Sequence, residues 1–156
     1  MRADLKYLLA TVLVMAATSS ALGQVRVSNA WVRATVARQS VTGAFMRLDS
    51  PTDARLISAT TPAAGAVEIH RMSMESDVMK MAPVTGIDIP AGTSVSLQPG
   101  GYHLMLIKLK SQIKAGDTIP LTLLIEDRDH KRTSVEVRAT ARPLNAAGGM
   151  GAMPRQ

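Results

Sequence analysis

A two-residue alternation of apolar and polar side chains is the feature of this sequence that most restricts its fold. Short runs with this period recur along the chain, and clusters of Pro, Gly, Asp and Ser separate them. An amphipathic helix needs a period near 3.6, and no window long enough for a helix has one. The pattern therefore predicts an all-β sandwich or barrel of about eight short strands. These strands are expected at residues 25–27, 31–33, 44–48, 66–69, 94–97, 104–109, 121–125 and 134–138.

The length and composition fit a single globular domain with an aliphatic core. The chain has 156 residues, of which 46% are hydrophobic, but only one Trp, two Tyr and one Phe. So few aromatic rings do not make the stacking platforms that bind nucleic acid, and we expect no nucleic-acid partner. Cysteine is absent. This excludes disulfide scaffolds, thiolate zinc sites, cysteine nucleophiles, lipid attachment to a cysteine and blue-copper electron transfer.

The beginning of the chain has the pattern of a secretory signal peptide. Arg2 and Lys6 flank the start of an apolar run at residues 7–17, and the small residues Ala21 to Gly23 follow it. That run is short for a bilayer, and no later segment approaches the ~20 apolar residues of a transmembrane helix. We predict an exported protein without a membrane anchor. Its parts are a cleaved signal peptide (1–23), a β-sandwich domain (24–144) and a disordered Gly- and Met-containing tail (145–156).

The positive charge of the chain is spread along it. The formal net charge is +6, and the basic residues do not form a block. We interpret them as a solvated surface that favours solubility. Attraction to an acidic protein patch or to anionic lipid is the alternative.

Methionine and histidine gather in two segments of a chain that has ten Met and three His. In residues 100–106, His103 and Met105 are two positions apart on a predicted strand, so they point to the same face. The other segment mixes these residue types with charged side chains and serines, which is unusual for a core. It spans residues 67–83 and contains His70, Met72, Met74, Met79 and Met81.

Thioether and neutral imidazole groups together favour a soft, monovalent metal ion. Thioether sulfur suits Cu(I) and does not suit Mg²⁺ or Ca²⁺, and imidazole also binds copper. Without a thiolate, such a site predicts Cu(I) that can be released. Packing is the alternative for any single methionine, because methionine is a common core filler. The residues leave the choice of sulfur open: Met79 and Met81 share a face if their segment is extended, and Met72 and Met74 could also reach an ion.

The spacing of these residues resembles a known signature. Ten residues separate His70 from Met81, twenty-one separate Met81 from His103, and one separates His103 from Met105. This is similar to the H(M)x10Mx21HxM motif of the periplasmic PCu(A)C copper chaperones. Further blocks that resemble the family are Ala30–Arg33, Gly43–Met46, Val67–His70, Val78–Met81, Ile89–Gly92, Pro99–Met105 and Leu121–Leu123.

The resemblance implies a cupredoxin-like Greek-key β-sandwich that carries one Cu(I) per chain in the periplasm. The ligands that it implies are His70, Met81, His103 and Met105. Family members deliver copper for assembly of the copper centres of cytochrome c oxidase. The implied partners are the copper-site subunit of that oxidase and a Sco-type thiol protein. We expect a monomeric metallochaperone that releases the ion by ligand exchange, with the site at the rim of the sandwich where the segment from His70 to Met81 is rich in loops.

Other functions remain as alternatives. General periplasmic copper scavenging, buffering or resistance would use the same ligands, so the sequence does not separate it from a dedicated chaperone. A structural β-sandwich module would bind no metal. An enzyme is not expected, because the chain has no nucleophile elbow, paired catalytic carboxylates or His-Glu metal motif.

Overall fold

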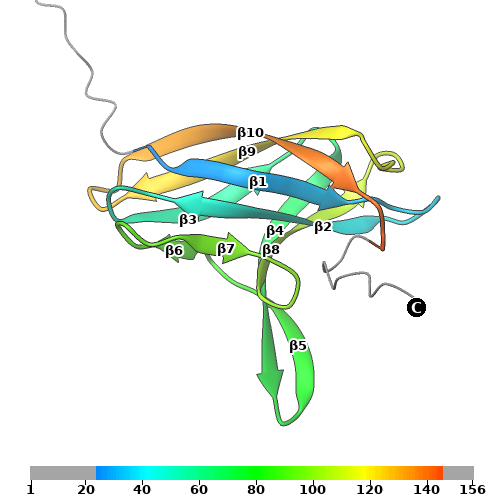
Figure 1. Cartoon of the computed structure of the whole chain (residues 1–156), viewed down its shortest axis with the longest axis horizontal. Helices are drawn as coiled ribbons and strands as arrows, with labels where there is room; N and C mark the ends of the chain where they lie inside the picture. Colours follow the sequence, from blue (N-terminus) through cyan, green and yellow to red (C-terminus); the bar gives the residue numbers. More distant parts are fainter. Residues whose placement is uncertain (1–23, 146–156) are drawn as a thin grey trace, which may run out of the picture.

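Ten β-strands make up residues 24–145, the part of the chain that the computed structural model describes (Figure 1). The predicted signal peptide and all but the first residue of the predicted tail lie outside these residues. No helix in the described part is long and apolar enough to cross a membrane. The strands are β1 (Arg26–Arg33), β2 (Val41–Asp49), β3 (Ala54–Thr60), β4 (Ala64–Glu75), β5 (Val78–Pro83), β6 (Ile87–Ile89), β7 (Val95–Leu97), β8 (Tyr102–Leu109), β9 (Thr118–Asp127) and β10 (Arg132–Arg142).

All ten strands join one mixed sheet that curls into two layers. Its order is β5-β4-β8-β7-β2-β1-β10-β9-β3-β6, with β2 also paired to β8. The β1–β10 and β7–β8 pairs are parallel, and the other pairs are antiparallel. Strands β3 and β4 contact each other although they stand near opposite ends of this order, because the sheet folds over on itself. The all-β prediction is confirmed.

The strand count differs from the predicted eight for local reasons. Two predicted strands are one strand, β1, whose register shifts between Ser28 and Trp31 at a bulge where Asn29 has φ 51°. Such an extra residue breaks the two-residue period. A second register shift in β3 hides its alternation in the same way. Strand β6 has only three residues, too few for a pattern.

The segment from His70 to Met81 is a β-hairpin, so the expectation of a loop-rich segment is wrong. Strand β4 pairs with β8 as far as Arg71, and beyond that point it pairs only with β5. Ser76 and Asp77 form the two-residue turn with φ of 48° and 62°, as in a type I′ hairpin. We call residues 72–82 the hairpin arm. It projects from the body of the domain (Figure 1), and every residue of β5 is exposed.

The hydrophobic core lies between the two layers and is aliphatic, as predicted. Strand β8 is unusual because side chains on both of its faces are buried: Leu104 and Leu106 face the core, while His103 lies on the opposite face. In the neighbouring strands, successive residues likewise alternate between the core face and the outer face of the layer. The largest fully buried side chains are Val32, Leu48, Leu56, Ile87, Ile89, Leu104, Leu106, Leu121 and Leu123.

Replacing a core side chain of β8 should destabilise the whole domain. Leu104 is 0% exposed, so Leu104→Ala should lower the free energy of unfolding by about 2–5 kcal/mol through lost burial and the cavity it leaves. Urea unfolding followed by circular dichroism measures this. The control is Val36→Ala at a 55% exposed position, where a change within about 0.5 kcal/mol is expected. Equal midpoints for the two variants would contradict this packing.

Candidate metal centre

A cavity of about 230 Å³ opens on the outer face of the layer that contains β1, β2, β8 and β4. Its strand residues occupy alternate positions, on the face opposite to the core residues of the same strands. A short loop before β8 completes the wall. The lining residues are Arg33, Gly43, Phe45, Met72, Met81, Pro99, Gly100, His103 and Met105.

Strand β8 supplies an imidazole and a thioether to this cavity from one face. His103 and Met105 both line it, as their spacing predicts. Gly43 stands directly opposite Met105 on β2. A Cβ at Gly43 would come within 2.9 Å of the Phe45 ring, so glycine at this position lets the ring pack closely against β2 in the cavity wall.

The hairpin arm supplies two more sulfur atoms. Met72 on β4 and Met81 on β5 are cross-strand partners, and both line the cavity. The sequence left Met72 among several candidates, because its place opposite Met81 depends on the register of a hairpin. Met81 is 49% exposed, so the cavity has one wall that solvent reaches. Met74 and Met79 form the next pair outward.

His70 lies beside the cavity without lining it. It stands opposite His103 in the β4–β8 ladder, with the two ring centroids 5.6 Å apart. Its Nε2 is 2.7 Å from Oε2 of Glu68. A carboxylate only accepts hydrogen bonds, so Nε2 donates, and the lone pair of the neutral ring is on Nδ1. That Nδ1 is buried and has no hydrogen-bond partner, as expected of a nitrogen kept free for a ligand.

The surroundings of His103 favour the neutral imidazole that a metal ion needs. Its pKa lies below the ordinary value, first because burial disfavours the charged ring. A hydrogen bond with the backbone of Gly101 acts in the opposite direction, and the nearby His70 and Arg33 lower the pKa further. The proton therefore competes less with a metal at neutral pH.

A row of rings continues from the two histidines across the layer. The Phe45 centroid is 6.1 Å from that of His103, and Trp31 stacks on Phe45 at 4.5 Å. The guanidinium of Arg142 lies over Trp31, 4.9 Å from its centroid. These contacts fix the wall of the cavity behind His103. The third histidine, His130, lies in the turn between β9 and β10, with a side chain that is 87% exposed.

Of the four residues that the motif predicted as ligands, the structure brings Met81, His103 and Met105 around one cavity and puts His70 next to it. Sequence reasoning did not identify Glu68, although its position two residues before His70 on a strand already implied a common face. Among residues 24–145, no three His, Cys, Asp or Glu side chains are grouped so as to hold a metal ion. A metal ion at this cavity would therefore need the methionine sulfurs as ligands.

Fold and site together define a cupredoxin-like β-sandwich whose outer face carries a cavity of neutral nitrogen and sulfur donors. The chain belongs to the LpqE-like family, because the family model described as "Putative lipoprotein LpqE-like" matches residues 25–137. Among relatives, it is 34% identical over 117 residues to "Putative lipoprotein Lxx21020" of Leifsonia xyli subsp. xyli. That match covers 73% of this chain and 69% of the relative.

Solved structures of PCuAC domains have the same fold. The copper-bound PCuAC domain from PmoF2 superposes with a TM-score of 0.63 at 21% identity, over 79% of this chain and 96% of that domain. The solution structure of CuI-DR1885 from Deinococcus radiodurans superposes with a TM-score of 0.53 at 29% identity, over 84% of each chain. The predicted cupredoxin-like fold and the resemblance to PCu(A)C proteins are confirmed.

Removing the Glu68 carboxylate should change the tautomer of His70. In the wild-type protein the neutral ring should carry its hydrogen on Nε2, because Glu68 accepts from that atom. Glu68→Ala should remove this preference, whereas Glu68→Gln should keep it, because the amide oxygen still accepts. The ¹⁵N chemical shifts of the His70 ring distinguish the two tautomers. A wild-type ring with its hydrogen on Nδ1 would contradict the assigned roles of the two nitrogens.

Proposed function

We propose that this protein is an exported Cu(I) metallochaperone that carries one Cu(I) per chain at the cavity. The observation that supports this most directly is the convergence of thioether and imidazole side chains from three strands on one cavity. The residues that would hold the ion are His70, Met81, His103 and Met105. CuI-DR1885, which has this fold at 29% identity, supports the choice of metal.

The donor set favours Cu(I) over harder or more highly charged ions. All four side chains are neutral when they bind, and thioether sulfur is a soft ligand. The buried, unpartnered Nδ1 of His70 fits a ligand role. Glu68 would then orient the ring from its other nitrogen, as carboxylates do behind many metal-binding histidines. The Arg33 guanidinium in the cavity wall repels a divalent ion about twice as strongly as a monovalent one.

The same arrangement suits release to an acceptor. His103 is buried, but Met81 belongs to a strand that is exposed throughout. A neutral thioether can be displaced by an incoming thiolate or imidazole without any proton transfer at the sulfur. In the proposed mechanism the exposed ligand Met81 is displaced first, and the buried side of the site holds the ion until a new ligand has bound it. The protein carries the ion without converting it into another chemical species, so the proposed role is not that of an enzyme.

The finer part of the proposal concerns location and acceptor. Export to the periplasm is supported by the signal-peptide pattern at residues 1–23 and by membership of a family described as lipoproteins, although this chain has no cysteine to carry a lipid. We propose that the acceptors are the copper-site subunit of cytochrome c oxidase and a Sco-type thiol protein. General scavenging or buffering of copper is the alternative that uses the same ligands.

Bulk-preserving substitutions test the ligands. Met81→Ile and Met105→Ile should each weaken Cu(I) binding by about 100-fold or more. Mutating a residue that only hydrogen-bonds to a metal ligand already lowers metal affinity by about 10–100-fold, and losing the ligand itself should cost at least as much. Competition with a Cu(I) chelator under anaerobic conditions measures this affinity. Wild-type protein should bind one Cu(I) and bind Zn²⁺ far more weakly.

Met46→Ile is the matched control, because Met46 is buried in the core at 2% exposure. It should leave the Cu(I) affinity unchanged. Unchanged affinity in the Met105→Ile variant would contradict the assignment of Met105 as a ligand. Equal affinity for Zn²⁺ would end the proposal of a Cu(I) carrier.

Transfer experiments test the acceptor. Cu(I)-loaded protein should pass its ion to the purified soluble copper-site domain of cytochrome c oxidase, in the presence of a chelator that captures any free Cu(I). Recovery of the copper in the chelator would indicate release to solution. Retention of the copper on this protein would favour scavenging or buffering.

A further inference from the structure

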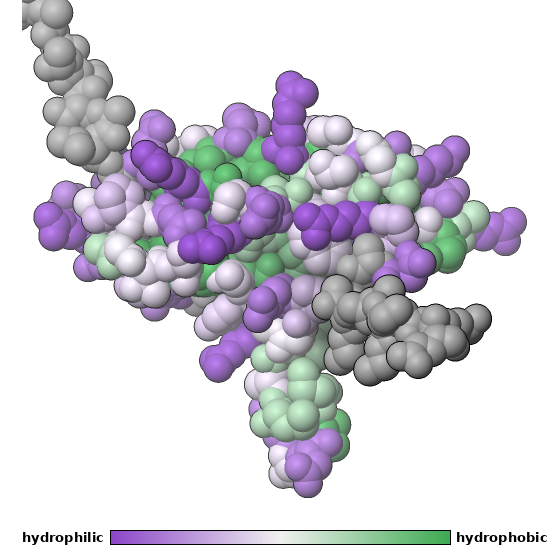
Figure 2. Space-filling view, in the orientation of Figure 1, coloured by the Kyte–Doolittle hydropathy of each residue, from purple (hydrophilic) through white to green (hydrophobic). Residues whose placement is uncertain are grey.

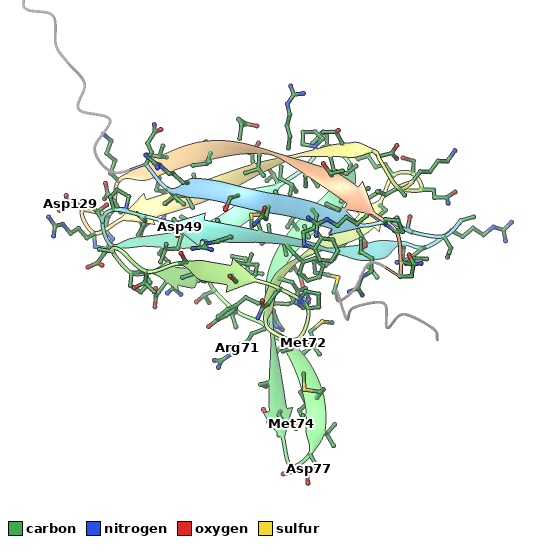
Figure 3. All side chains as sticks on the ribbon, in the orientation of Figure 1. Asp49, Arg71, Met72, Met74, Asp77 and Asp129 are labelled. Atoms are coloured by element: carbon green, nitrogen blue, oxygen red, sulfur yellow. The ribbon has the colours of Figure 1, made fainter. Side chains whose placement is uncertain are left out.

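The hairpin arm carries two consecutive pairs of methionines on one face. Met72 stands opposite Met81, and Met74 stands opposite Met79. Because side chains alternate along a strand, both pairs point to the same side of the arm. Figure 3 shows Arg71 and Met72 leaving β4 to opposite sides, with Asp77 at the tip. The four sulfurs therefore form a ladder that begins at the cavity and runs outward.

The outer pair is not explained by packing. Met74 is 63% exposed and Met79 is 45% exposed. The projecting arm carries a moderately hydrophobic surface (Figure 2). Directly opposite side chains in an antiparallel pair have Cβ atoms about 4.5–5.5 Å apart. Two flexible thioethers at that separation can approach one ion together.

The arm holds this pair in place from its other face and from its turn. Lys80 and Glu75 form an ion pair with Nζ 2.6 Å from Oε2, on the face opposite to the methionines. The two-residue turn at Ser76 and Asp77 fixes the register. Successive pairs are separated by two residues, about 6.6–6.8 Å along a strand. Long, unbranched side chains can cover much of this distance.

We propose that Met74 and Met79 form an outer, transient Cu(I) site from which the ion passes through Met72 and Met81 to the cavity, and by which it leaves. This inference rests on the proposed function. At each step a new copper–sulfur bond forms as another breaks, the oxidation state stays Cu(I), and no proton moves. The outer site has two thioethers and no imidazole, so it binds more weakly than the cavity and can load or release an ion.

Direct binding is tested by NMR of the methionine methyl groups with Cu(I) as the probe. In wild-type protein the first equivalent should shift the methyls of Met81 and Met105, and further Cu(I) should shift those of Met74 and Met79. In the Met81→Ile/Met105→Ile variant, added Cu(I) should still shift the outer two. Outer methyls that do not respond in either protein would overturn the proposal. If only the outer methyls responded and the cavity methyls did not, the proposed function and the relay would both be overturned, and Met74 and Met79 would remain as a separate Cu(I) site.

Transfer between copies of the protein tests the role in exchange. Loaded, unlabelled protein is mixed with isotopically labelled copper-free protein, and NMR follows the appearance of labelled loaded protein. Met74→Leu/Met79→Leu in both partners should slow this transfer about tenfold, with the affinity of the cavity unchanged. Val78→Leu, on the opposite face of the arm, is the matched control and should transfer at the wild-type rate. Unchanged transfer in the double variant contradicts the relay, and an equal loss of affinity would assign these residues to the cavity site instead.

Discussion

The antiparallel pairing of β4 with β8 is the interaction on which the site depends. It sets His70 opposite His103 and Glu68 opposite Met105, although the two histidines are 33 positions apart in the sequence. A slip of β8 by one residue would turn His103 toward the core and Leu104 toward the cavity. The register of this one ladder therefore fixes both the donor set and the hydrophobic packing.

Strand β8 links the stability of the domain to the site. Leu104 and Leu106 are fully buried in the core, and His103 is buried on the opposite face. A strand covered on both sides has little freedom to move, so the imidazole starts in a fixed place. The ring row through Phe45 and Trp31 supports it from the side. Rigidity behind the site and exposure in front of it suit a protein that holds an ion and then gives it up.

Exposure of the hairpin arm has an energetic cost. Burying a methionine fully contributes about 1.5–3 kcal/mol, and Met74 and Met79 forgo much of that by standing in solvent. Met46 shows the usual alternative, since it is buried in the core. Leaving a neutral thioether in solvent nevertheless costs less free energy than burying a charged ligand. An exposed sulfur also remains accessible for ligand exchange. The arm thus gives up some stability for access.

The sequence by itself determined the all-β class, the common face of His103 and Met105, and a set of soft donors, because period and residue type are local properties. The tertiary structure alone decided that Met72 faces Met81, that Glu68 hydrogen-bonds to His70, and that Gly43 stands opposite Met105. It also decided that the segment after His70 is a projecting hairpin. The contact of Glu68 with His70 depends on side-chain conformations within β4. The pairings of Met72 with Met81 and of Gly43 with Met105 depend on the register between strands, which is set as the strands pair during folding. No alternation within a single strand contains it.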